Sequence, residues 1–230
     1  MSKIQEIEVT KLLWDATLYP RVDISDMNVT RYADCLRAGE TFPNIHVEEK
    51  TKRIIDGVTR WKAWQKVYGG DSKIPCELHN PKNDAEFFRM AVEFNTAHGL
   101  QLNPFERTKC LLRFDELGVS REVALRALRM TVDSAEKMEK AKTAFRTLPG
   151  GKKEKIAIKG AMHDFRGETL TGKQQSTNKM SGGMRPAYYI EQLIGLVESG
   201  LCAKAESKVL DRLEDLRALL NDKLRKRKSA

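Results

Sequence analysis

In the first eighty residues, short apolar runs alternate with stretches of helical periodicity. Two helical stretches, at 29–39 and 58–70, both end in glycine, a common helix terminator. The apolar runs are rich in β-branched residues and bounded by turn residues, a pattern that predicts strands. They are IQEIEV at 4–9, NIHV at 44–47, RIIDG at 53–57 and IPCEL at 74–78. We therefore expect a small mixed α/β unit.

Beyond this unit the pattern becomes helical. A helix is expected at 83–99, with Asn83 as its cap and acidic residues in its first turn, and it closes a first domain at 1–100. Three further helices are expected, at 103–118, 120–130 and 131–148. They make a second, all-α domain at 101–148. The expected fold class is therefore α+β.

The last third of the chain divides into a connector and helices. Residues 149–185 hold seven of the 15 glycines and read as a basic connector, although the apolar IAIKGAMHDF within it indicates that part of it folds or docks. The C-terminal segment, 186–230, is expected to be helical at 186–200 and 205–230. Its last helix carries a stripe of Leu213, Leu216, Leu220 and Leu224. Such a stripe packs within its own domain or against a second copy, and we expect a homodimer.

Charge indicates the class of partner. The net charge is +9, and residues 146–185 alone hold nine basic and three acidic side chains. A basic segment favours a polyanion, so nucleic acid is the leading partner, with a basic surface kept for solubility as the alternative. No apolar run approaches the roughly 20 residues of a membrane span. We expect a cytoplasmic, nucleoid-associated protein with no membrane partner.

Two helices joined by a very short turn, at 120–130 and 131–148, favour a helix-turn-helix that binds double-stranded DNA. Any helical hairpin with polar outer faces produces the same pattern, and Arg129 stands where such turns often have glycine. If the second helix reads DNA, its first turns supply the contacts to bases and Arg129 a contact to phosphate. The expected DNA-binding residues are Arg129, Thr131, Asp133, Ser134 and Lys137.

A second candidate site lies in DGVTRWKAW, at 56–64. A strand that ends at Gly57 and turns into a helix leaves free backbone N–H groups, which suit an anion. Thr59 can donate a hydroxyl hydrogen bond there, and Arg60 can contact phosphate oxygens with two donors. An ordinary strand, turn and helix is the alternative.

These motifs, taken in order, resemble the ParB and sulfiredoxin family over roughly residues 4–145. Gly57 and Arg60 match the Gly-x-x-Arg of the family's phosphate site, and Arg21 stands on the arginine of its P-x-R motif. The helix with Asn95 and His98 runs through LNPFE into the helical segment, as in ParB proteins. The resemblance implies a phosphate or nucleotide site made by Arg21, Gly57, Thr59, Arg60, Asn95 and His98.

In ParB proteins this domain binds CTP with magnesium and acts as a switch, so the resemblance implies a nucleotide such as CTP here. Two acids and one guanidinium of the family pattern are missing, which implies a poor magnesium site, since magnesium needs oxygen ligands. The reactive cysteine of sulfiredoxin would fall on Val58, which argues against reductase activity. Enzymatic activity stays open, at most a weak nucleotide triphosphatase.

Metal chemistry has no support in the spacing of candidate ligands. The four cysteines form no CxxC pair, and His46, His79 and His163 lie far apart. We expect no metal site. The function that fits best is a DNA-binding ParB-like protein, either a transcription regulator or a partition protein. A nucleotide-dependent enzyme, a phosphotransferase or nuclease, is the alternative, and a helical adaptor that binds protein is the third.

Overall fold

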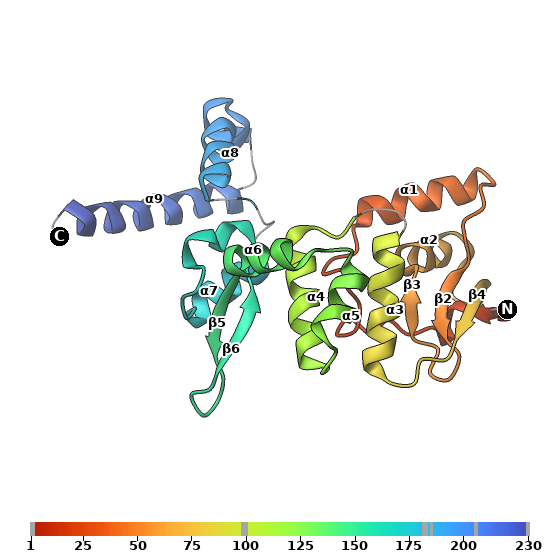
Figure 1. The fold of residues 1–230 in the computed structure, drawn as a ribbon. Helices are drawn as coiled ribbons and strands as arrows, with labels where there is room; N and C mark the ends of the chain where they lie inside the picture. The colour runs from red at the N-terminus through yellow and green to blue at the C-terminus, as the bar shows by residue number, and fades with distance from the viewer. Residues whose placement is uncertain (1–2, 98–100, 181–183, 185, 205–206, 229–230) are drawn as a thin grey trace.

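The computed structural model describes residues 3–97, 101–180, 184, 186–204 and 207–228. A four-stranded sheet with α1, α2 and α3 lies at one end of the molecule, α4 to α6 lie in the middle, and a hairpin with α7 to α9 lies at the other end (Figure 1). The combination of a small mixed sheet with several helices confirms the expected α+β class.

The sheet contains all four strands that the sequence predicts. Its spatial order is β1-β4-β2-β3, in which β4 runs parallel to β2 and antiparallel to β1. β3 pairs antiparallel to β2, with a register shift at His46 and Val47. The strands are β1 (Lys3–Glu8), β2 (Ile45–Glu48), β3 (Ile54–Asp56) and β4 (Lys73–His79), and the short η1 (Val9–Lys11) follows β1.

Two helices, α1 (Asp26–Arg37) and α2 (Val58–Tyr68), pack against each other, and α2 also packs on the sheet. Apolar side chains that alternate along the strands make the buried core under Trp61 and Trp64. α1 begins three residues earlier than predicted, because the Ser25 side chain accepts a hydrogen bond from the backbone of Asn28 and caps the helix.

A second core joins the two predicted domains. α3 (Asp84–Ala97) packs against α4 (Pro104–Glu116) and α5 (Arg121–Leu128). The rings of Phe88 and Phe114 meet edge to face at 4.9 Å, and the Thr96 hydroxyl donates to the carbonyl of Ala127 at 2.9 Å. Residues on both sides of the predicted boundary at 100/101 therefore share one apolar interior.

The expected helix at 131–148 is wrong in its second half. α6 (Val132–Lys142) ends where Thr143 adopts an extended conformation, and β5 (Thr143–Thr147) pairs antiparallel with β6 (Lys153–Ala157). Thr, Phe and Thr alternate along β5, which favours a strand, and the Pro-Gly-Gly turn returns the chain. The pairing of β5 with β6 therefore ends the helix at Lys142.

Much of the predicted connector is folded. After β6 comes η2 (Gly160–Phe165), which packs on buried apolar residues of the hairpin, and then α7 (Gly172–Met180), which contacts η2. The Asn178 amide ties α7 to the strand end, since it accepts from the backbone of Lys159 at 2.8 Å and donates to the carbonyl of Ala157 at 3.0 Å. The apolar run IAIKGAMHDF is the part that docks, as its composition indicated.

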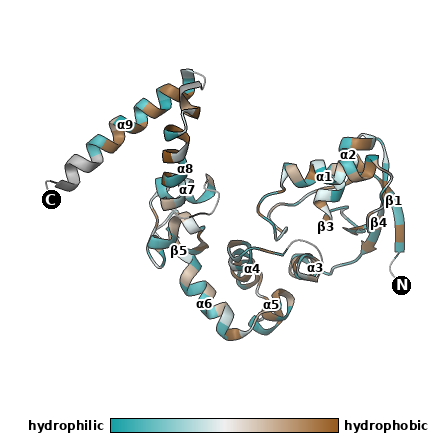
Figure 2. Ribbon diagram, turned by 90° about the horizontal axis from the view of Figure 1, so that it is seen from above, coloured by the Kyte–Doolittle hydropathy of each residue, from teal (hydrophilic) through white to brown (hydrophobic). Residues whose placement is uncertain are grey.

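The C-terminal helices leave apolar side chains exposed. α8 (Pro186–Glu198), η3 (Leu201–Lys204) and α9 (Ser207–Lys228) follow one another away from the rest of the chain, and Figure 2 shows hydrophobic residues along α8. Leu213 and Leu216 are half-buried and Leu220 is exposed, whereas the Leu224 side chain lies outside the described residues. No helix within the described ranges has the length and apolar character that a bilayer span requires.

Candidate functional site

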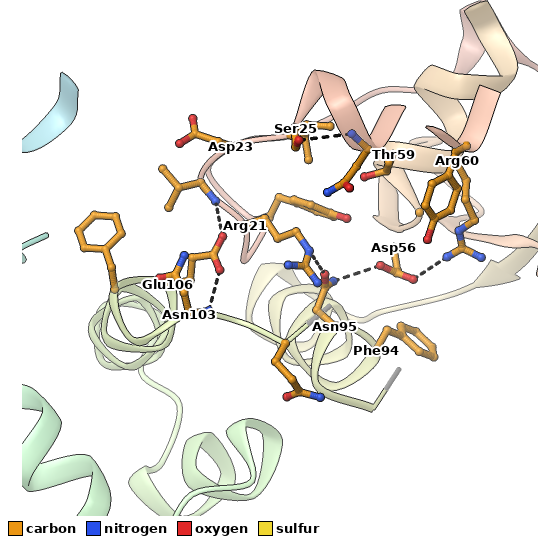
Figure 3. A pocket seen from close by; sticks show the side chains of 18 of the residues that line it. Arg21, Asp23, Ser25, Asp56, Thr59, Arg60, Phe94, Asn95, Asn103 and Glu106 are labelled. Atoms are coloured by element: carbon orange, nitrogen blue, oxygen red, sulfur yellow. Dashed lines mark hydrogen bonds and ion pairs between the residues drawn. The ribbon is translucent and has the colours of Figure 1, made fainter. Parts of the chain in front are cut away.

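A cleft of about 1170 Å³ lies where the start of α2, the end of α3 and the start of α4 come together. Figure 3 shows side chains from these elements and from the loop before α1 pointing into it. The residues that matter for its chemistry are Tyr19, Arg21, Asp56, Gly57, Thr59, Arg60, Asn95, Glu106, Lys142 and Lys159. The structure therefore brings five of the six predicted phosphate-site residues together, and the sixth, His98, lies outside the described residues.

Four side chains form one continuous polar chain across the cleft (Figure 3). Arg21 Nε donates to Asn95 Oδ1 at 2.9 Å, and Asn95 Nδ2 donates to Asp56 Oδ1 at 3.2 Å. The other oxygen of Asp56 accepts from Arg60 Nη2 at 2.7 Å. Asn95 is only 2% exposed, so this chain fixes two cations at set positions in the cleft wall.

Gly57 is required by the packing of the turn. Its φ is +103°, and a β carbon there would lie 2.6 Å from Cγ2 of Ile45. A glycine at the start of α2 therefore allows the backbone to lie close to Ile45 of β2. Gly57 has no side chain with which to cap α2. The Val58 N–H contacts the Tyr19 phenol, so the N–H groups that stay available, among the described residues, are those after it, near Thr59.

Arg60 is held more firmly than its sequence position indicated. Besides Asp56, it donates from Nη1 to the carbonyls of Pro43 at 2.7 Å and Asn44 at 2.9 Å, and its side chain is 16% exposed. These contacts preorganise the guanidinium and also compensate part of its charge. Arg60 is therefore largely buried rather than a freely exposed side chain.

Glu106 fastens the cleft's opposite wall. One of its carboxylate oxygens accepts from the backbone of Asn103 at 2.9 Å, and the Asn103 side chain caps α4 in return. The other oxygen accepts from the backbone of Val22 at 3.2 Å. The segment that carries Arg21 is thereby anchored to α4. The Asn-x-x-Glu spacing of a capping box was a signal in the sequence for the contacts between Asn103 and Glu106.

Positive charge exceeds negative charge in the cleft. Among its described lining residues, five are basic and three are acidic. The basic ones are Arg21, Arg31, Arg60, Lys142 and Lys159, and the acidic ones are Asp23, Asp56 and Glu106. Burial, helped by the charge of Asp56, raises the pKa of Tyr19, whose phenol stays protonated. The two lysines come from the end of α6 and the segment after β6, and no local motif marked them.

The predicted DNA-binding residues lie at the turn between α5 and α6. Arg129 has φ +52° and ψ +49°, so it adopts the left-handed conformation that glycine usually supplies in such a turn. Thr131 caps α6 by accepting from the backbone of Ser134 at 3.2 Å. Ala135 is buried against the core, whereas Arg129, Thr131, Asp133, Ser134 and Lys137 are all exposed.

Folding also assembles a cluster that the sequence spacing did not indicate. Glu77 and His79 alternate on β4 and so share one face of the sheet, and His46 lies beside them on β2. Burial lowers the pKa of both histidines, while the nearby Glu77 carboxylate opposes the shift. Two histidines that were expected to be unrelated therefore form one polar group.

No family model matches this sequence, and no curated protein matches it either. Several solved structures are similar to the chain. One is a C-terminally truncated chromosome-partitioning protein ParB from Caulobacter crescentus complexed with CTP-gamma-S, with 15% identity, a TM-score of 0.36, and coverage of 59% of this chain and 76% of that one. The same protein complexed to the centromeric parS site has 15% identity and a TM-score of 0.41, over 58% and 69% of the two chains.

A Pnob8-like ParB-N domain is similar at 16% identity and a TM-score of 0.40. The match covers 68% of this chain and 57% of that one. These structures are ParB proteins, the family that the sequence motifs resemble.

Proposed function

We propose that this protein binds double-stranded DNA through α5 and α6, arranged as a helix-turn-helix. The observation that carries the proposal is the placement of α6: Ala135 anchors it to the core, and its first turns project polar side chains to solvent. A recognition helix reads base edges with residues near its N-terminus. Ser134 and Lys137 have the donors for such contacts, and Asp133 can accept from cytosine.

Lys137 forms an exposed ion pair with Asp133 at 2.8 Å. An exposed pair of this kind contributes little to stability, so it can open at small cost when a base or phosphate competes for the lysine. Arg129, exposed at the turn, is proposed to hold a phosphate.

The hairpin of β5 and β6 adds a basic arm that continues directly from α6. Lys152, Lys153 and Lys155 are exposed along its tip and second strand. Phosphate contacts from such lysines raise affinity for every duplex without reading sequence. Residues 146–157 of this arm hold four basic and one acidic side chain, which is half of the excess positive charge of residues 146–185.

The experiment that tests DNA binding is selection of bound duplexes from a random pool by the purified full-length chain, with and without nucleotide. A helix-turn-helix protein enriches a defined, commonly palindromic sequence. Enrichment of no sequence, together with binding that disappears at moderate salt, would leave only non-specific attraction. A defined site still does not separate a regulator from a partition protein, and the position of that site near promoters or near replication origins makes this distinction.

We further propose that the cleft binds the phosphates of a nucleotide. Arg21 and Arg60 are preorganised on its wall, N–H groups of α2 are available near Thr59, and Lys142 and Lys159 add positive charge. Acidic residues that would hold magnesium are few at this site, so binding should depend little on that ion. A switch between nucleotide-bound and free states is the corresponding regulatory role.

Calorimetric titration with CTP, ATP and GTP, with and without magnesium, tests this second proposal. Arg60→Lys is the informative variant, because it keeps the charge beside Asp56 while it removes the two-pronged contact. Binding of at least one nucleotide, weakened in this variant, is expected. If no nucleotide gives a heat of binding at millimolar concentration, the cleft does not bind nucleotide and the proposal is wrong.

We propose that the protein is a homodimer through α8 and α9. Large apolar side chains on these helices are exposed in the single chain, among them Ile190 at 57% and Val197 at 51%. Several large exposed apolar side chains on two helices favour an interface, and two-fold symmetry suits a helix-turn-helix protein.

If instead purified protein consumes nucleotide or cuts DNA, the alternative of a nucleotide-dependent enzyme is favoured.

A further inference from the structure

His46, Glu77 and His79 converge on one face of the sheet, beside the cleft. In the parallel pairing of β2 and β4, His46 lies opposite Glu77, and His79 follows two positions along the same face. His46 Nδ1 and His79 Nε2 are 2.9 Å apart. The Glu77 oxygens lie 3.8 Å from His46 Nδ1 and 3.9 Å from His79 Nε2. One donor atom from each side chain thus falls within 4.8 Å of the others.

The three side chains are incompletely satisfied as they stand. The two facing ring nitrogens share at most one hydrogen bond, which needs a lone pair on one of them. The Glu77 carboxylate is 27% exposed, and within the described parts of the chain no side chain donates a hydrogen bond to it. With both imidazoles neutral, the cluster carries one negative charge and converging lone pairs.

We propose that His46, Glu77 and His79 bind a first-row divalent cation of the zinc class, through Nδ1 of His46, Nε2 of His79 and a carboxylate oxygen of Glu77. Zinc binds imidazole nitrogen at about 2.0–2.1 Å, which sets two such nitrogens roughly 3.4 Å apart in a tetrahedral site. The observed 2.9 Å between the ring nitrogens lies within a small ring rotation of that spacing. Two imidazoles with one carboxylate suit zinc, nickel or cobalt, whereas magnesium and calcium favour oxygen ligands.

The surroundings hold the ligands in place. The Phe94 ring stacks on His46 with centroids 4.0 Å apart and an interplanar angle of 11°, and it also lies 5.5 Å from the His79 ring. One side of the pair is thus covered by an apolar ring, which fixes the His46 orientation. Of the three ligands, His46 is the one that lines the cleft, and three protein ligands leave one position of a tetrahedral ion open for water.

The proposal does not depend on DNA or nucleotide binding by this chain. A purely structural alternative exists, in which the His46–His79 hydrogen bond simply joins the two strands. The two alternatives differ in the role of Glu77. The His46–His79 hydrogen bond does not involve the Glu77 carboxylate, whereas the metal site uses it as a ligand.

The test uses full-length protein treated with a chelator, then titrated with zinc chloride by calorimetry and with cobalt chloride by visible absorption. The variants are Glu77→Gln, which keeps the shape and removes the charge, and His79→Gln. His163→Gln is the matched control, because His163 is also partly exposed but lies in η2, next to Asp164, outside the cluster. Thermal melts establish that each variant is folded.

Wild type and His163→Gln should bind one zinc equivalent, and cobalt should produce the strong visible bands of a tetrahedral site. Each cluster variant should weaken zinc binding by about tenfold or more, since one ligand in three is removed. Equal binding by Glu77→Gln and wild type would favour the structural alternative and overturn the proposal. So would absence of both stoichiometric zinc binding and the cobalt bands in wild type, a result that holds even if a variant fails to fold.

Discussion

Arg21 and Asn95, 74 positions apart in the chain, are joined by a hydrogen bond of 2.9 Å from the guanidinium Nε to the amide oxygen. The contact links the loop before α1 to α3. The Asn95 amide also donates a hydrogen bond to Asp56 at the end of β3. Asn95 is therefore the link on which the geometry of the cleft depends.

Replacing Asn95 with leucine should destabilise the protein by about 1–3 kcal/mol, because half-buried partners of the amide lose their hydrogen bonds. The measurement is urea unfolding at neutral pH. Asn80→Ala is the control, since Asn80 is exposed and its side chain bonds Glu49 at the surface. A loss no larger than that of the control would mean that the polar chain is not coupled to folding.

Gly57→Ala should be more damaging than Gly118→Ala. Both glycines have positive φ, +103° and +67°, so both substitutions introduce backbone strain of about 1–3 kcal/mol. At Gly118 a β carbon meets nothing within 4 Å, whereas at Gly57 it would lie 2.6 Å from Ile45. Thermal melts of the two variants isolate the steric term. Equal melting temperatures would show that β2 moves aside freely.

Arg60→Ala should lower stability as well as nucleotide binding. The variant leaves the half-buried Asp56 carboxylate without its ion pair and removes two hydrogen bonds to backbone carbonyls, for a loss of about 1–3 kcal/mol. Arg60→Lys should recover part of that loss because it restores the charge. Unfolding curves of the pair check this, and an unchanged midpoint for Arg60→Ala would contradict the contacts described above.

Two variants of the α5–α6 turn should separate sequence-specific contacts to bases from contacts to phosphates. Ser134→Ala combined with Lys137→Ala should relax sequence preference. Arg129→Gly should weaken all duplexes alike and reduce the salt slope by about 1, the signature of a lost phosphate contact. Glycine suits the left-handed turn, so Arg129→Gly should not destabilise the fold. Fluorescence anisotropy on specific and random duplexes makes the measurement, and parallel losses in both variants would argue that α6 reads nothing.

Disrupting the apolar stripe of α9 should produce monomers. Leu213→Lys with Leu220→Lys places two charges on the surface proposed for the interface, while Arg212→Ala alters an exposed residue of the same helix. Sedimentation equilibrium at tens of micromolar should find a dimer for wild type and Arg212→Ala and a monomer for the double variant. A monomeric wild type would remove the interface.

The sequence by itself determined the features that depend on neighbouring residues. Alternation marked the four strands, and helical spacing marked α2, α3, α4 and α8 to within a few residues. The Asn103 cap with Pro104 placed the start of α4, because capping and turn chemistry act over three or four residues. The Gly57–Arg60 motif marked one wall of the cleft for the same reason.

Tertiary structure decided what meets across the chain. Thr143 to Thr147 had a plausible helical continuation, and only pairing with Lys153–Ala157 made it a strand. The Arg21–Asn95 contact and the His46–Glu77–His79 cluster follow from how strands and helices are registered against each other. Alternation tells which face of its own strand a side chain occupies, but the register between β2 and β4 depends on packing of the whole core. Proximity of that kind is absent from any local pattern, which is why the spacing of the histidines along the chain gave no sign of their cluster.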